Sequence, residues 1–156
     1  MFHSNSTRLP LIIAIAMAAH TASAENLAPL NTLEIIGLSG NEVTAFQTPQ
    51  SGNIVQISLS GAGNGAPTGN HIADPTWFGT LTPGNISQKG TLQTIVLAVS
   101  GNGNLFAISQ TGSRNSALGQ VSGTLNSAVI QQSGTANRAN FVQLGSGNSL
   151  SVLQKM

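Results

Sequence analysis

The chain of 156 residues carries few charges (6%), no cysteine and a formal net charge of +1. Because an average soluble domain is about 25% charged, this chain lacks the charge repulsion that normally keeps proteins apart in solution. Its few scattered bases exclude a phosphate-binding surface, so we expect no nucleic acid partner, and without cysteine it has no stabilising disulfide.

The first predicted element is a secretory signal peptide at residues 1–24. A polar segment ends at Arg8, an apolar run covers residues 11–19, and residues 22–24 (Ala-Ser-Ala) form a small-residue cleavage site. The apolar run is too short to span a membrane, and no later stretch could span one, so we expect no stable membrane insertion. An N-terminal anchor that stays attached is the less favoured alternative.

Residues 25–64 form the next predicted segment, a region of degenerate repeats. Two loose copies of a motif that is clearer downstream lie at residues 41–47 and 53–59. Every proline after the signal peptide precedes residue 84. Since proline blocks the addition of strands at a sheet edge, the N-terminal part of the chain is the more guarded one.

Residues 65–81 interrupt the repeat and contain two prolines and the only tryptophan, Trp77. Because proline cannot donate a hydrogen bond to a sheet, this segment is predicted to be an insertion loop that bulges from the stack, with a linker between two stacks as the alternative. Within it, His71 and Asp74 could contact a metal ion. A metal site needs more ligands than these two, so neither a metal nor another cofactor is expected.

Residues 82–156 repeat every eleven residues as Asn-x-Ala-x-apolar-x-Gln-x-Gly-Ser/Thr-x. Seven consecutive units are recognised; the first two begin at Thr82 and Gln93, and Val121 replaces one glutamine. Such a fixed period predicts units that stack on their neighbours. The repeated residues are the asparagines Asn104, Asn115, Asn126, Asn137 and Asn148, the glutamines Gln110, Gln132, Gln143 and Gln154, and the turn glycines Gly101, Gly112, Gly123, Gly134 and Gly145.

Each unit is predicted to be a strand followed by a tight turn. Side chains of a strand alternate between its two faces, so the asparagine, the apolar residues and the glutamine of a unit share one face. Glycine supplies the positive φ that the turn requires. Two units make one rung of about 22 residues, and alternate strands stack into two parallel sheets. The predicted fold is all-β, a β-solenoid or cross-β stack of strand-turn-strand rungs.

The inner faces of the two sheets are predicted to pack large side chains against small ones, with Phe106 and Ile108 facing Ala117 and Gly119. The amides at the strand ends carry both donors and acceptors, so stacked copies can hydrogen-bond along the axis. The alternative is that they cap turns at a solvated surface. We favour ladders of Asn104, Asn126 and Asn148 on one sheet, of Asn115 and Asn137 on the other, and of Gln110, Gln132 and Gln154.

The spacing of these residues resembles the curlin repeat, Ser/Asn-x5-Gln-x-Gly-x2-Asn-x-Ala-x3-Gln. The resemblance is firm over residues 100–156, weaker over 82–99 and faint over 31–64. One copy departs from the pattern because Val121 stands where the second glutamine is expected. The copy that matches at every step consists of Asn126, Gln132, Gly134, Asn137, Ala139 and Gln143.

The resemblance implies a structural subunit of an extracellular amyloid fibre at the bacterial cell surface. Curlin subunits are secreted through an outer-membrane channel with accessory factors and polymerise outside the cell, where the fibres support adhesion and the biofilm matrix. The implied partners are further copies of the chain and a second curlin-type subunit. Both roles known in the family, major subunit and minor nucleator, remain open.

Other functions are less favoured by the sequence. It contains no carboxylate pair, no cysteine nucleophile and no glycine-rich phosphate loop between a strand and a helix, so we do not expect an enzyme. One alternative is a soluble, monomeric β-solenoid adhesin that binds through Trp77 and Phe78. The other is a disordered matrix segment rich in glycine and asparagine.

Overall fold

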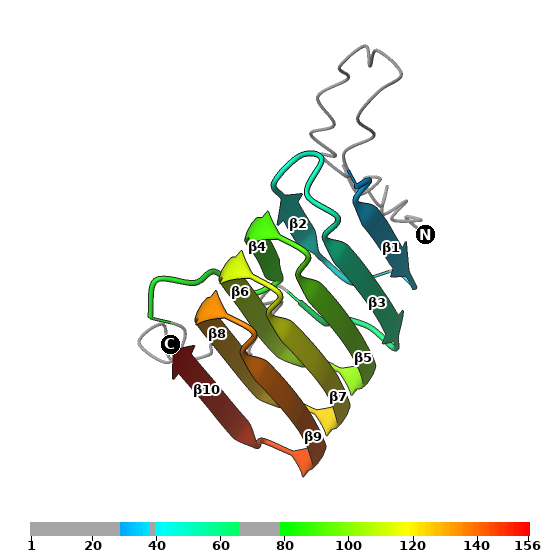
Figure 1. Ribbon diagram of the computed structural model, residues 1–156. Helices are drawn as coiled ribbons and strands as arrows, with labels where there is room; N and C mark the ends of the chain where they lie inside the picture. Colours follow the sequence, from blue (N-terminus) through cyan, green and yellow to red (C-terminus); the bar gives the residue numbers. More distant parts are fainter. Residues whose placement is uncertain (1–28, 38–39, 66–78) are drawn as a thin grey trace, which may run out of the picture.

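The computed structural model describes residues 29–37, 40–65 and 79–156, which form ten strands in two parallel sheets (Figure 1). The predicted signal peptide lies outside these residues. The odd sheet consists, in order, of β1 (Thr32–Ile36), β3 (Ile54–Ser60), β5 (Thr94–Asn102), β7 (Ser116–Thr124) and β9 (Arg138–Ser146). The even sheet consists, in order, of β2 (Thr44–Gln47), β4 (Asn85–Thr91), β6 (Leu105–Ser113), β8 (Ser127–Thr135) and β10 (Ser149–Lys155).

The chain alternates between the two sheets, so that one strand of each sheet makes one rung of a solenoid. Strands β5 and β7, β6 and β8, and β7 and β9 pair in parallel, and equivalent residues of neighbouring rungs are 22 apart. The predicted all-β solenoid with two strands and about 22 residues per rung is therefore confirmed. Among the described residues there is no helix, and accordingly none that could cross a membrane.

The insertion enters the solenoid at a single point of the second rung. Asn64 is hydrogen-bonded to Asn104, 40 residues away, and Gly65 pairs with Leu105. The next register position is occupied by Gly84, whose backbone N–H donates to the carbonyl of Phe106. The extra residues thus lie between Gly65 and Gly84, and residues 66–78 are outside the described part of the chain.

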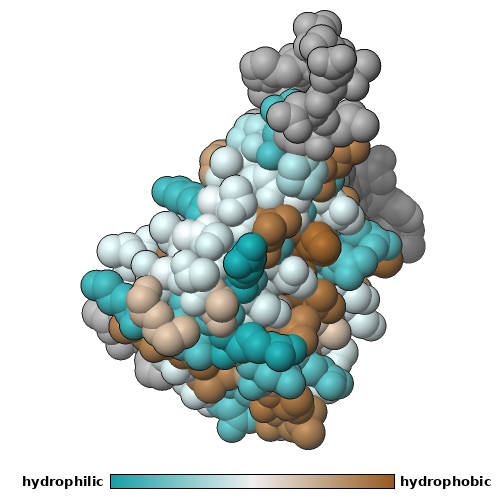
Figure 2. Space-filling model, in the orientation of Figure 1, coloured by the Kyte–Doolittle hydropathy of each residue, from teal (hydrophilic) through white to brown (hydrophobic). Residues whose placement is uncertain are grey.

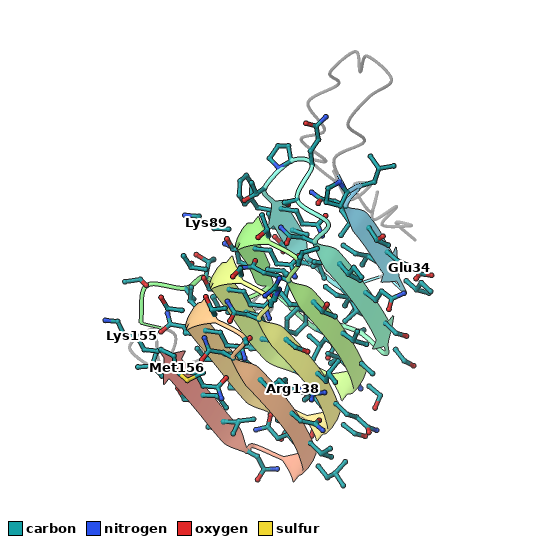
Figure 3. The ribbon with its side chains drawn as sticks, in the orientation of Figure 1. Glu34, Lys89, Arg138, Lys155 and Met156 are labelled. Atoms are coloured by element: carbon teal, nitrogen blue, oxygen red, sulfur yellow. The ribbon has the colours of Figure 1, made fainter. Side chains whose placement is uncertain are left out.

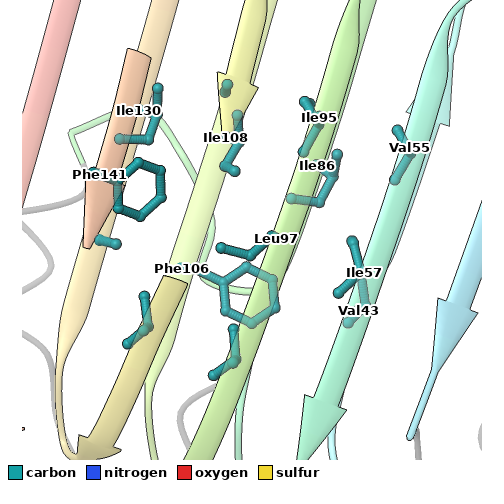
Figure 4. Close-up of a cluster of buried hydrophobic side chains, with 14 of the residues drawn as sticks. Val43, Val55, Ile57, Ile86, Ile95, Leu97, Phe106, Ile108, Ile130 and Phe141 are labelled. Carbon is teal, nitrogen blue, oxygen red and sulfur yellow. The ribbon is translucent and has the colours of Figure 1, made fainter. Parts of the chain in front are cut away.

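The inward side chains of both sheets form one continuous core (Figure 4). In two columns of the core a large residue stacks on a small one: Phe106 pairs with Ala128, and Gly119 pairs with Phe141. A Cβ atom on Gly119 would overlap the ring of Phe141, so this glycine makes room for the aromatic side chain of the next rung. The predicted contacts across the two sheets remain a prediction.

The outer faces of the two sheets differ. On the even sheet, Leu105, Ala107 and Val129 point outward yet are buried, and Leu81 packs against them. Leu81 belongs to the segment that leads into β4, so this segment covers part of the outer face. On the last strand of the odd sheet, by contrast, the outward Val142 is 64% exposed.

Candidate functional site

A column of asparagines runs along the turn that precedes each strand of the even sheet. Within it, Oδ1 of Asn104 accepts hydrogen bonds from the backbone N–H (3.1 Å) and from Nδ2 (3.0 Å) of Asn126. Asn126 receives the same two bonds from Asn148, at 3.0 and 3.1 Å. The complete column is Asn41, Asn64, Asn104, Asn126 and Asn148.

The spacing of eleven identified three members of this column but not Asn64. Counting back from Asn104 leads to Gln93 and Thr82, whereas the residue that bonds to Asn104 is Asn64, at 3.0 Å. Thr82 therefore does not occupy the asparagine position of its unit. Asn64 could have been identified from the N-terminal copies, because it lies eleven residues after Asn53.

The odd sheet has a second column, which is less regular. Oδ1 of Asn115 accepts from the backbone N–H and Nδ2 of Asn137, both at 3.0 Å. Further up, Oδ1 of Asn31 accepts from the backbone of Asn53, and Oδ1 of Asn53 from the backbone of Gln93. The Oε1 atom of Gln93 is buried without a partner, so the longer side chain interrupts the column between the two pairs.

The same amides also fasten the turns. Nδ2 of Asn126 donates to the carbonyl of Ser122, four residues earlier (3.4 Å), and to the carbonyl of Gly145 in the next rung (2.8 Å). Asn126 is fully buried. The side-chain amide of Asn126 therefore makes both the stacking bonds and the turn-capping bonds that the sequence suggested as alternatives. It does so in the interior and not at a solvated surface.

The glutamines form an unbroken ladder on the even sheet only. Nε2 of Gln110 donates to Oε1 of Gln132, and Nε2 of Gln132 donates to Oε1 of Gln154, both at 2.7 Å. The ladder extends upward through Gln88 and Gln47 with bonds of 3.0 Å. Gln110 and Gln132 are buried, so these bonds satisfy groups that water does not reach.

Gln143 is not brought together with the other glutamines. It lies on β9, and its register partner on β7 is Val121. The column continues with Val99 and Leu59, so the position is apolar through the interior of the odd sheet. Nε2 of Gln143 donates to the carbonyl of Ser127 (3.2 Å), but its buried Oε1 has no partner.

The two kinds of ladder have opposite polarity. Each glutamine donates toward the C-terminal rung, as in the bond from Gln132 to Gln154. In the bonds between stacked asparagine side chains, the donor lies one rung closer to the C-terminus than the acceptor, as in the bond from Asn137 to Asn115. The last rung therefore ends in asparagine acceptors, and Oδ1 of Asn137 is buried there without a partner.

The predicted turn glycines have φ between +100° and +124°, a region that favours glycine. They are also stacked closely. A Cβ atom on Gly112 would overlap the carbonyl oxygen of Gly134, and one on Gly123 would overlap that of Gly145. Near Gly145 itself no backbone atom lies within 4 Å of such a Cβ. Interior turns therefore require glycine for two reasons: the positive φ, and the carbonyl of the neighbouring rung that leaves no room for a Cβ atom.

A further feature of the turns is not apparent from the sequence. From Asn41 onward, the residue just before each asparagine of the two columns adopts a left-handed conformation even where it is not glycine, for example Arg114 (φ 56°), Leu125 (φ 57°) and Ala136 (φ 58°). This conformation costs about 1–2 kcal/mol for an L-residue. The backbone N–H of each of these residues donates to a carbonyl of the preceding rung, as that of Ala136 does to Ser113 (2.9 Å).

Comparison with known proteins supports the assignment from the repeat. Residues 123–155, which cover β8, β9 and β10 with the turns between them, match the family model of the curlin associated repeat. This part of the chain is a curlin associated repeat. The resemblance seen in the spacing of the amides and glycines is thereby confirmed for this region. No curated protein and no solved structure matches the chain.

Neither an acidic nor a histidine cluster adds a second kind of site in the described residues. No group of three or more His, Cys, Asp or Glu side chains gathers in residues 29–37, 40–65 and 79–156. His71 and Asp74, which could contact a metal ion by their spacing, lie outside these ranges, as do Trp77 and Phe78.

Proposed function

We propose that this curlin-type protein is a structural subunit of an extracellular fibre, and that its function is its own polymerisation. The observation that carries this proposal is the state of the last rung. Asn137 is 1% exposed and its Oδ1 has no donor, whereas Oδ1 of Asn115, one rung earlier in the same column, accepts two hydrogen bonds. An orphaned buried acceptor costs about 1–3 kcal/mol, which a further rung would recover.

The strands at this end support the same conclusion. β9 and β10 each have one strand neighbour among the described residues, so each presents a row of open backbone groups. Natural proteins usually blunt such edges with proline, inward charges or bulges. β9 and β10 carry none of these devices on their inward face, where Ala139, Phe141, Leu150 and Val152 lie. An edge of this kind is a template for another strand.

In this proposal the chain is exported, and its fibre lies at the cell surface and supports adhesion and the biofilm matrix. Its partners are further copies of itself and a second curlin-type subunit, and an outer-membrane channel with accessory factors exports it. The role is structural and involves no cofactor. Both the major-subunit and the nucleator role are compatible with an open last rung.

The test is incubation of the purified chain with a thioflavin-type dye over hours to days. Dye-binding fibres with a diffraction spacing of about 4.7 Å are the expected result. A chain that keeps a β-sheet circular dichroism spectrum but stays monomeric would instead be a soluble solenoid, as in the adhesin alternative. A chain without β signal at any time would be a disordered matrix segment.

The cellular role is tested separately. Deletion of the gene, scored for dye-binding surface fibres with and without added major curlin subunit, distinguishes the two family roles. Loss of fibres that added major subunit restores identifies this chain as the major subunit. Loss that only this chain restores identifies a nucleator.

A further inference from the structure

Large apolar side chains that point outward from the strands and remain exposed occur on the first and last rungs of the described solenoid. On the first rung, Ile36 is 56% and Phe46 is 47% exposed. On the last rung, Val142 and Leu144 are both 64% and Leu153 is 71% exposed. Figure 2 shows apolar side chains at the lower end of the molecule, around β9.

Four of these residues, all except Leu144, belong to two columns that have the same composition pattern. The column that starts at Ile36 and ends at Val142 passes through Ser58, Ala98 and Gln120. The column that starts at Phe46 and ends at Leu153 passes through Ser87, Ser109 and Gln131. Both columns are therefore large and apolar at the two ends and small or polar between them.

We infer that a second copy of the chain docks its first rung on the last rung in the continuing register, with Ile36 of the second copy beside Val142 and Phe46 of the second copy beside Leu153. This inference rests on the proposed function and adds to it the register of the contact. In a parallel sheet, residues of one column lie about 4.8 Å apart, so each pair would be in contact. Side chains exposed in the single chain would be buried in the assembly.

The amide ladders continue in the same register. Asn31, the first asparagine of the odd-sheet column, would lie one rung beyond Asn137 and supply the donors that its buried Oδ1 lacks. On the even sheet, Nε2 of Gln154 would point toward Gln47 of the second copy, as Nε2 of Gln132 points toward Gln154. Docking of two last rungs on each other would instead bring asparagine acceptors face to face.

Charge is distributed in the same sense. After position 24, every acidic residue precedes residue 75 and every basic residue follows residue 88. Figure 3 shows Glu34 near the first rung and Arg138 and Lys155 near the opposite end. In the continuing register, Thr32 of the second copy lies beside Arg138, and Glu34 is two residues further along the same face. Exposed pairs of this kind add little affinity, but they favour this orientation over the reverse.

The absence of cysteine allows a direct test of the register. Within one chain, positions 46 and 153 are four rungs, or about 19 Å, apart, too far for a disulfide. Fibres of the Phe46→Cys/Leu153→Cys chain, assembled in reductant and then oxidised, are expected to give a covalent ladder of oligomers on a denaturing gel. The same result is expected for Ile36→Cys/Val142→Cys.

The matched controls move one cysteine by two residues on the same face. In Phe46→Cys/Ser151→Cys and Ile36→Cys/Asn140→Cys, the Cα atoms of neighbouring copies would be about 8 Å apart, beyond disulfide range. We expect at least tenfold less cross-linked oligomer. Equal ladders from matched and offset pairs, or dimers alone, would overturn the inferred register.

A second experiment does not depend on cross-linking. Because Leu153 is 71% exposed, Leu153→Lys should leave the chain folded and slow fibre elongation at least tenfold, and adding Phe46→Glu should restore most of the rate. Elongation unaffected by Leu153→Lys would contradict the inference. If the unsubstituted chain forms no fibres, the proposed function itself fails. Normal fibres with off-register cross-links leave that function intact and reject only the register.

Discussion

Replacement of Gln132 by alanine tests whether the glutamine ladder stabilises the fold. The side chain is 2% exposed and makes three hydrogen bonds, from Gln110 Nε2 (2.7 Å), to Gln154 Oε1 (2.7 Å) and to the carbonyl of Ser116 (3.0 Å). Alanine leaves one buried Nε2–H of Gln110 without a partner and removes the side-chain donor to the Ser116 carbonyl. At about 1–3 kcal/mol for an orphaned buried group, the free energy of unfolding should fall by about 1–3 kcal/mol.

The matched control is Gln120→Ala. Gln120 is an exposed glutamine that points outward from β7, and a surface substitution of this kind changes stability by about 0.5 kcal/mol or less. Urea unfolding followed by circular dichroism, under conditions in which the chain stays monomeric, measures both variants. Since a domain is stabilised by about 5–15 kcal/mol in total, the difference should be visible as a large shift of the midpoint. Equal midpoints for the two variants would show that the buried amide of Gln132 contributes no more to stability than the exposed amide of Gln120.

Gly112→Ala should destabilise the chain more than Gly145→Ala, because both residues have positive φ but only Gly112 lies against a carbonyl of the next rung. The midpoints of urea unfolding measure the difference. Equal losses of stability in the two variants would mean that the positive φ, at about 1–3 kcal/mol, accounts for the whole effect. Ala136→Gly should raise the free energy of unfolding by up to about 1 kcal/mol by relieving the left-handed φ of 58°, and a lower midpoint would contradict this. Gln143→Val, which extends the column of Val121 and removes the orphaned Oε1, should stabilise by about 1–3 kcal/mol, whereas a loss would mean that the oxygen has a partner in solution.

Much of the fold follows from the spacing of residues along the chain. An eleven-residue period with alternating apolar positions is compatible with a strand and a turn but not with a helix, so it predicts the all-β solenoid and its 22-residue rung. The same period places Asn104 and Asn126 one rung apart, and also Gln110 and Gln132. These inferences succeed because one rung differs from the next only by a translation, so sequence spacing becomes spatial neighbourhood.

The spacing fails where the chain leaves the stack and returns. Asn64 bonds to Asn104 across 40 residues, and only the hydrogen bonds of the folded column identify it, because the inserted residues change the count without changing the register. For the same reason the sequence assigned the asparagine position of this unit to Thr82.

Differences between the two sheets were also decided by the tertiary structure. The sequence contains glutamine at four of the five last positions of the C-terminal units, but only those on the even sheet meet one another, while Gln143 stacks on Val121. Likewise, Leu105 and Val142 are both apolar and both point outward, yet one is buried and the other 64% exposed. A periodic sequence determines which residues can stack, since this depends on local geometry. Burial and hydrogen-bond partners depend on which strands are neighbours, and only the tertiary structure determines the neighbours.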